Sequence, residues 1–224
     1  MIEIRAFLFD MDGVIVDSNP LHREVWAEYN RLHGIHTTDE MQLRMYGKRN
    51  DEIVRDFFGS DLSDEEISAH GAAKEELYRE RLRPDIRNSL VPGVRQFLER
   101  HRNVPAAVAT NAEPANVNFV LDEAGLRQYF RVTVDGHQVR NPKPHPEIYL
   151  RAAEELGVEP QFCVVFEDSH TGVEAGVAAG MRVVGVSTSH EDLQGISLLI
   201  SGFNDPALEP WLARQGLGAQ TPTT

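Results

Sequence analysis

The sequence predicts an α/β protein with a doubly wound parallel sheet that is interrupted by an all-helical insertion. Two observations indicate the sheet: short runs that are apolar on both faces, and helical patterns between those runs from about residue 88 onward. A third observation indicates the insertion, because residues 18–87 replace this alternation with consecutive helical patterns. We therefore expect residues 1–17 and 88–224 to form an α/β core and residues 18–87 to form a helical domain.

Four apolar runs are expected to form buried strands. They cover residues 6–9, 104–109, 162–166 and 182–187. Helices are expected over residues 114–124 and 146–156, where apolar side chains recur on one face, and from about His170. Because strands and helices alternate, the connections are expected to be right-handed crossovers between parallel strands.

The insertion is expected to begin with an amphipathic helix. Its apolar face is formed by Leu21, Val25, Tyr29 and Leu32. Residues 51–58 and 64–82 have helical patterns that are rich in Glu, Arg and Lys. Residues 90–93, Leu-Val-Pro-Gly, are typical of a linker and are expected to return the chain to the core.

The composition argues against several classes of function. There are 22 Lys and Arg residues against 35 Asp and Glu, a net charge of −13, so neither nucleic acid nor an anionic membrane is expected as the main partner. No apolar run is long enough to span a bilayer and the first residues lack a signal-peptide pattern, so we expect a cytoplasmic protein. We expect a monomer, because no exposed apolar stripe is evident.

The cysteine and histidine content gives little support for a structural metal site. A single cysteine excludes an intrachain disulfide framework and any zinc cluster built on cysteines. None of the nine histidines forms a helix-spaced pair with a carboxylate nearby, so we expect no zinc site.

Polar side chains stand just after the apolar runs, where ligands bind in open α/β sheets. They are Asp10, Asp12, Thr110, Asn111, Glu167 and Asp168, with Lys143 in a loop between two prolines. Several carboxylates that converge in a partly dry cleft repel one another unless a cation or protons join them. A Mg²⁺ ion and the fixed charge of Lys143 would balance them, and such a site suits phosphoryl transfer to a carboxylate.

Four segments of the sequence carry a family resemblance. They are residues 9–18 (FDMDGVIVDS), 109–111 (ATN), 142–144 (PKP) and 166–169 (FEDS). In this order they resemble the four motifs of the haloacid dehalogenase-like hydrolases. The resemblance covers about residues 7–187 and implies a Rossmann-like core. The place of the insertion is similar to the helical cap of the β-phosphoglucomutases and the phosphoglycolate phosphatase-like enzymes, which closes over the site and selects the substrate.

The resemblance implies a role for each residue of the first two motifs. Asp10 would be the nucleophile that forms an aspartyl-phosphate, and Asp12 would protonate the leaving oxygen and then activate water. Gly13 would permit the tight turn that brings both aspartates to the same target. Thr110 and the backbone at Asn111 would bind the oxygen atoms of the transferring phosphoryl group.

The third and fourth motifs would supply charge and metal ligands. By the same resemblance, Lys143 would neutralise Asp10 and the phosphate. Mg²⁺ would be held by Asp10, by the backbone carbonyl of Asp12 and by Asp168, with Glu167 acting through a water molecule.

Three residues of the insertion are candidates for substrate binding. His22, Arg49 and Lys74 occupy positions that face the cleft in the similar phosphatases and mutases. Judged from the residues alone, Arg49 and Lys74 are better explained as solvated charges on a highly charged face than as substrate contacts. His22 fits a helix-surface or interdomain histidine equally well.

The sequence favours one function and leaves two others open. The favoured function is a Mg²⁺-dependent phosphomonoester hydrolase that acts on a small phosphorylated metabolite, because Asn111-Ala112 after Thr110 resembles the hydrolases. A mutase similar to β-phosphoglucomutase would use the same residues but return the phosphoryl group to the sugar. A non-catalytic binding protein on this fold would be favoured by loss of the motif residues, and none is lost.

Overall fold

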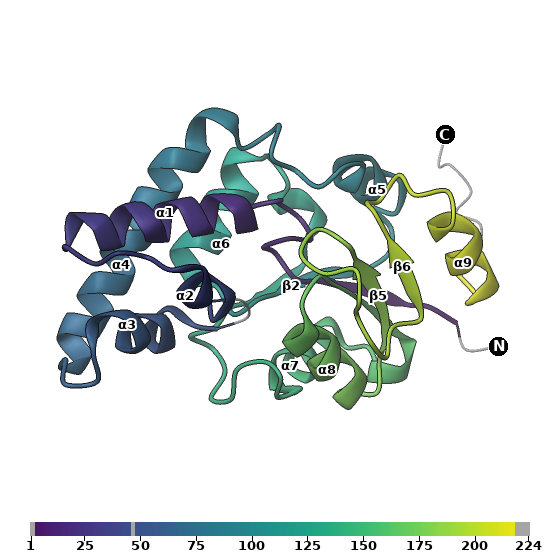
Figure 1. Cartoon of the computed structure of the whole chain (residues 1–224). Helices are drawn as coiled ribbons and strands as arrows, with labels where there is room; N and C mark the ends of the chain where they lie inside the picture. The colour runs from purple at the N-terminus through teal and green to yellow at the C-terminus, as the bar shows by residue number, and fades with distance from the viewer. Residues whose placement is uncertain (1–2, 46–47, 218–224) are drawn as a thin grey trace.

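The computed structural model describes residues 3–45 and 48–217, and its centre is a six-stranded parallel sheet (Figure 1). The strand order is β3-β2-β1-β4-β5-β6, which confirms the predicted doubly wound α/β fold. The strands are β1 (Ala6–Phe9), β2 (Ala106–Ala109), β3 (Val132–Val134), β4 (Cys163–Glu167), β5 (Arg182–Val186) and β6 (Leu198–Ile200).

The first strand lies at the point where the order of the strands reverses. Phe7 of β1 pairs with Ala106 of β2 on one side and with Val164 of β4 on the other, both in parallel. In doubly wound sheets this switch point leaves a crevice beyond the carboxyl ends of the strands. The polar residues that follow β1 and β4 therefore stand at the edge where a ligand is expected to bind.

Helices cover both faces of the sheet, so alternate side chains of each strand enter different apolar clusters. Phe7 and Phe9 belong to one cluster, and Ala6 and Leu8 belong to the other. The first cluster also contains side chains of α5 (Val94–Arg100), α6 (Pro114–Glu123) and α9 (Leu208–Arg214). The second contains side chains of α7 (Glu147–Leu156) and α8 (His170–Ala178). Short 3-10 turns cover Arg83–Asp85, Arg127–Tyr129 and Pro160–Phe162.

Small residues let α8 approach the sheet closely. A Cβ atom at Gly172 would lie 1.8 Å from Oε1 of Glu167, and one at Gly176 would lie 2.8 Å from Cγ2 of Val183. The side chain of Ser169 accepts a hydrogen bond from the N–H of Gly172 and so caps the helix. This contact of α8 with β4 fixes Glu167 and Asp168 against the start of the helix.

Four further helices gather beyond one end of the sheet (Figure 1). They are α1 (Asn19–Leu32), α2 (Asp39–Leu43), α3 (Asn50–Phe58) and α4 (Asp64–Leu82), and we call them the cap helices. A separate apolar cluster that includes Trp26, Ile53 and Ile67 holds them together. The predicted apolar face of α1 is buried at Val25 and Tyr29, whereas Leu32 at its end is 62% exposed. The domain boundaries given above stay a prediction.

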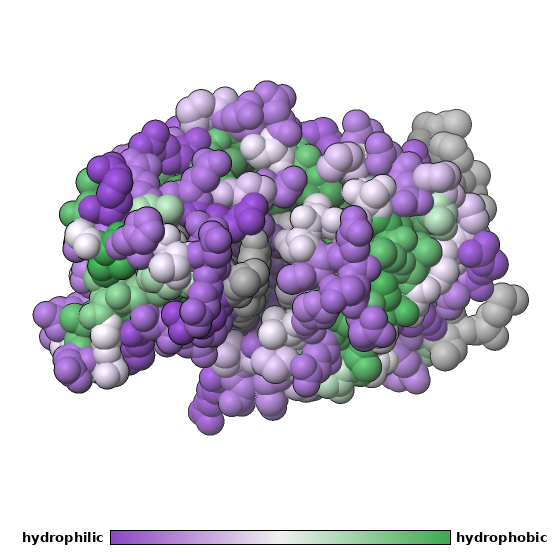
Figure 2. All heavy atoms as spheres, in the orientation of Figure 1, coloured by the Kyte–Doolittle hydropathy of each residue, from purple (hydrophilic) through white to green (hydrophobic). Residues whose placement is uncertain are grey.

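Hydrophilic residues cover most of the face of the molecule in Figure 2, over the cap helices as well as beside the sheet. Within residues 3–45 and 48–217, none of the helices combines the length and the apolar character needed to cross a bilayer.

Candidate active site

A cavity of about 460 Å³ is lined by the cap helices and by the residues that follow the strands. Its lining contains all the predicted site residues except Gly13, namely Asp10, Asp12, His22, Arg49, Lys74, Thr110, Asn111, Lys143, Glu167 and Asp168. Side chains that are distant in the sequence therefore meet in one place, as expected from the strand ends. Their individual roles stay predictions.

The floor of the cavity is a buried cluster around Lys143. Its Nζ lies 2.6 Å from Oδ1 of Asp10 and 2.6 Å from Oε1 of Glu167, and the lysine is only 6% exposed. The hydroxyl group of Tyr149 donates to the same Oε1 at 2.7 Å. The other oxygen of Glu167 accepts the backbone N–H groups of Asp168 at 3.0 Å and Ser169 at 3.2 Å. With both of its oxygens engaged, Glu167 holds Lys143 against Asp10.

Burial and charge give the carboxylates of this cluster different pKa values. Burial raises the pKa of Asp10 to about 7, against the opposing effect of Lys143. Burial, together with the charges of Glu167 and Asp10, also holds the pKa of Asp168 well above its ordinary value. Burial acts in the same direction on Glu167, but the charge and hydrogen bond of Lys143 outweigh it and lower that pKa. Burial therefore disfavours the charged forms of Asp10 and Asp168 more than that of Glu167, and a bound cation would favour them.

The cluster fits a hard divalent cation. Asp10, Glu167 and Asp168 each offer a carboxylate oxygen, these atoms lie within 4.8 Å of one another, and all three residues are buried. Oxygen donors of this kind are those that Mg²⁺ prefers. A cation bound here would offset the cost of burying the charged forms of Asp10 and Asp168, whose pKa values burial raises.

The carboxylate of Asp12 has different neighbours, although it is only two residues from Asp10. Its Oδ1 accepts a hydrogen bond from Oγ of Ser18 at 2.5 Å and lies 3.4 Å from both Nε2 of His22 and the hydroxyl oxygen of Tyr78. The rings of His22 and Tyr78 stack at 3.9 Å. Burial opposes ionisation of Asp12, but the hydrogen bond and charge of His22 prevail and lower its pKa. Asp12 is therefore a carboxylate at neutral pH.

The turn after Asp12 requires glycine. Gly13 has a φ of +80°, and a Cβ atom there would lie 1.9 Å from Oδ2 of Asp168. The position thus needs both the left-handed conformation and the missing side chain, which fits the predicted tight turn.

Two residues of the second motif contribute at the end of β2. Thr110 is 2% exposed, and its Oγ1 accepts the N–H of Ala112 at 3.3 Å. The side chain of Asn111 accepts the backbone N–H of Lys143 at 3.3 Å. Asn111 therefore helps to place the loop that carries the lysine.

The cap helices place a second buried lysine beside the cavity. Lys74 is 1% exposed, so the expectation of a solvated charge is wrong for this residue. Its Nζ lies 2.8 Å from Nδ1 of His22 and 2.8 Å from Oε1 of Glu75, which supplies the compensating charge. Arg49 lines the cavity with its side chain 28% exposed, and its Nε is 3.6 Å from Asp51.

Sequence analysis missed two residues that hold Asp168. Nδ2 of Asn19 donates to Oδ2 of Asp168 at 2.9 Å and to Oγ of Ser189 at 2.6 Å, and Ser189 also donates to Asp168. Ser189 follows β5, so the strand-end rule that identified Asp168 could have found it as well. Asn19 begins a helix before a proline, and nothing in that pattern indicates a bond to a residue 149 positions away.

Comparison with known proteins shows the family of the chain. The sequence model of the haloacid dehalogenase-like hydrolases matches residues 4–180. Fructose-1-phosphate phosphatase YqaB of Escherichia coli is 34% identical over 183 residues, which cover 81% of this chain and 95% of that protein. A phosphorylated carbohydrates phosphatase of Thermotoga maritima is 35% identical over 206 residues, which cover 89% and 92%.

A solved structure of similar fold extends the comparison. It is a β-phosphoglucomutase from Clostridium difficile with a TM-score of 0.84 and 27% identity, and the match covers 95% of this chain and 97% of that one. The chain belongs to the haloacid dehalogenase-like hydrolases. The resemblance noted in the four motifs and the expectation of an enzyme of this family are both confirmed.

Proposed function

We propose that the protein is a Mg²⁺-dependent phosphomonoester hydrolase that acts on a small phosphorylated sugar or similar metabolite. The observation that carries the proposal is the buried cluster of Asp10, Lys143, Glu167 and Asp168, which lines a cavity that the cap helices also line. The names of two relatives, a fructose-1-phosphate phosphatase and a phosphorylated carbohydrates phosphatase, support a sugar phosphate as substrate.

In the first proposed step, a carboxylate oxygen of Asp10 attacks the phosphorus atom of the substrate. The bond between phosphorus and the ester oxygen breaks, and Asp12 gives a proton to that oxygen as the alcohol leaves. Lys143, 2.6 Å from Asp10, keeps the attacking group in place and offsets negative charge. The product of this step is an aspartyl-phosphate on Asp10.

In the second step, water attacks the phosphorus atom while Asp12 accepts a proton from it. The bond between phosphorus and Asp10 then breaks, which releases inorganic phosphate and restores the free carboxylate. Asp12 suits the role of base because its pKa is lowered in the substrate-free protein. A phosphate dianion that enters beside Asp12 raises the pKa of Asp12, so the same group gains the proton that the first step needs.

The metal would be held by Asp10, Asp168 and the backbone carbonyl of Asp12, and Glu167 would act on it through a water molecule while keeping Lys143 in position. When bound, Mg²⁺ would supply positive charge to the oxygen atoms of the phosphoryl group. Thr110 and the backbone N–H of Asn111 would donate hydrogen bonds to the same oxygens.

We also propose the domain division that the sequence predicts, with a core of residues 1–17 and 88–224 and a cap of residues 18–87. In this scheme His22, Arg49 and Lys74 bind the part of the substrate beyond the phosphate. Their place in the lining of the cavity supports that role. Closure of the cap over the core would exclude water during the first step.

The test is release of inorganic phosphate from a panel of small phosphomonoesters, with and without Mg²⁺. We expect metal-dependent release that Asp10→Asn lowers by at least about a thousandfold. Asp135→Asn is the matched control, because Asp135 is also a buried aspartate directly after a parallel strand but does not line the cavity. Full activity of Asp10→Asn, or equal losses in both variants, would contradict the proposal.

A mutase is the second candidate, because the fold resembles that of a β-phosphoglucomutase at a TM-score of 0.84. Its reaction would pass the phosphoryl group from Asp10 back to a sugar hydroxyl instead of to water. Incubation with β-glucose 1-phosphate separates the two reactions. Glucose 6-phosphate with little free phosphate would indicate the mutase, and free phosphate with glucose would indicate hydrolysis.

A further inference from the structure

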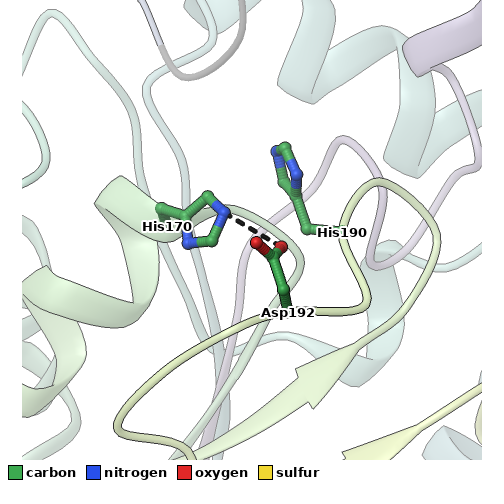
Figure 3. Close-up of side chains that lie close together, drawn as sticks. All are labelled: His170, His190 and Asp192. Carbon is green, nitrogen blue, oxygen red and sulfur yellow. Dashed lines mark ion pairs between the residues drawn. The ribbon is translucent and has the colours of Figure 1, made fainter.

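A second group of potential metal ligands has no part in the proposed reaction, and one of its members, His190, also lines the cavity. It consists of His170, the first residue of α8, with His190 and Asp192 from the loop between β5 and β6 (Figure 3). Helix spacing in the sequence gave no sign of this site, because its ligands come from two segments about twenty residues apart. The parallel pairing of β4 with β5 brings the two segments together.

The geometry is close to that of a metal site. Nε2 of His170 lies 3.3 Å from Oδ1 of Asp192, and one ligand atom from each of the three residues lies within 4.8 Å of the others. Ligands about 2.0–2.1 Å from a tetrahedral zinc ion stand roughly 3.4 Å apart. One pair is therefore already at the required separation. Small side-chain rotations can bring in the third ligand, because His170 and Asp192 are 49% and 79% exposed.

The types of ligand distinguish this group from the carboxylate cluster. Two imidazoles and one carboxylate favour zinc or a similar transition ion, whereas an all-oxygen set favours Mg²⁺. The ring centroids of the two histidines are 4.5 Å apart.

We propose that His170, His190 and Asp192 form a zinc site, with a fourth position open to water or another ligand. Bound Zn²⁺ links the start of α8 to the loop after β5. This loop also carries Ser189, which holds Asp168, so the site adjoins the carboxylate cluster without sharing a ligand with it. The inference does not depend on the proposed phosphatase activity.

The test is calorimetric titration of the Mg²⁺-saturated protein with Zn²⁺. We expect one Zn²⁺ to bind per chain, and His170→Ala, His190→Gln and Asp192→Asn each to weaken binding by about tenfold or more. His36→Ala is the matched control, because this exposed histidine lies in the segment between α1 and α2. Asp168→Asn tests whether the zinc enters the carboxylate cluster instead.

A spectroscopic measurement identifies the ligands directly. Cu²⁺ bound at the same site should show nitrogen hyperfine coupling from imidazole in its electron paramagnetic resonance spectrum, and His190→Gln should reduce that coupling. Wild-type affinity for Zn²⁺ in all three cluster variants would overturn the proposal. Loss of Zn²⁺ binding in Asp168→Asn together with wild-type affinity in His190→Gln would also overturn it.

Discussion

Glu75 is the group whose removal should most clearly change the dependence of stability on pH. It lies on α4 and is 3% exposed, and its Oε1 accepts hydrogen bonds from Lys74 at 2.8 Å and from Asn50 at 2.7 Å. Its Oε2 accepts from Asn116 of α6 at 2.7 Å. One carboxylate thus joins α3 and α4 of the cap helices to a helix that covers the sheet.

These contacts set the size of the expected effect. Burial opposes the charge of Glu75, but Lys74 and the other partners prevail and hold its pKa at about 2, against an ordinary value of 4.5. At about 1.4 kcal/mol per pKa unit, this difference corresponds to about 3 kcal/mol of stability. Because the pKa is lowered on folding, the contribution is fully present above pH 4.5 and is lost as the pH falls toward 2.

The perturbation is Glu75→Gln, which removes the charge but keeps the size of the side chain. We expect the variant to be destabilised by about 3 kcal/mol at neutral pH and by less than half of that near about pH 3. The assay is urea unfolding at a series of pH values between these limits. The wild-type free energy of unfolding should fall more steeply with acidification than that of the variant.

Glu28→Gln is the matched control. Glu28 pairs with Arg81 at 2.6 Å and so joins α1 to α4, but both side chains are partly exposed, at 30% and 53%. An exposed pair of this kind contributes about 0–1 kcal/mol. If the wild type and Glu75→Gln lose stability in parallel on acidification, Glu75 is not held in its charged form, and the reasoning from burial and Lys74 is refuted.

Three further predictions concern the site and the core. Gly13→Ala should abolish Mg²⁺-dependent activity, because its Cβ atom would lie 1.9 Å from Oδ2 of Asp168. Gly34→Ala is the control: its φ is +76°, no atom lies within 4 Å of the added Cβ, and the free energy of unfolding in urea should fall by only about 1 kcal/mol. An active Gly13→Ala variant would contradict this account. The affinity for Mg²⁺ should rise as the pH increases toward the pKa of about 7 of Asp10, by up to about tenfold per pH unit for each proton that binding releases. A calorimetric affinity that does not change with pH would be the contrary result. Burial raises the pKa of Cys163 to about 12, so its thiol should react with a disulfide reagent only after unfolding, whereas rapid reaction of the native protein would show that the strand opens.

The sequence predicted the inner strands well and the edge strands poorly. β1, β2, β4 and β5 have neighbours on both sides and are buried, so they are apolar on both faces and can be recognised by composition alone. The edge strands β3 and β6 have only three residues each, and side chains such as Leu199 are exposed. Such segments resemble loops, because pairing with a single neighbour requires neither length nor continuous burial.

The residues of the candidate site also divide into those that the sequence could predict and those that it could not. Residues that directly follow buried strands could be predicted, since the carboxyl ends of parallel strands meet at one edge of the sheet. Lys74 could not be placed correctly, because its burial depends on Glu75 and on Asn116, which is 41 positions from Glu75. A helix that is charged on every side looks solvated in sequence, and only the tertiary pairing shows which of its charges are buried.

The two aspartates after β1 respond to different parts of the molecule. Asp10 contacts Lys143, which Glu167 at the end of β4 holds in place. Asp12 instead contacts His22 and Tyr78 of the cap helices. Burial raises the pKa of Asp10, and the cap-borne His22 lowers that of Asp12. Movement of the cap helices away from the sheet would remove the contacts of Asp12 with His22 and Tyr78 but leave the contact of Asp10 with Lys143 intact. The cap helices therefore act directly on Asp12 through His22, whereas the charged partner of Asp10 lies outside them, and this difference in surroundings suits the proposed roles of a nucleophile and an acid–base group.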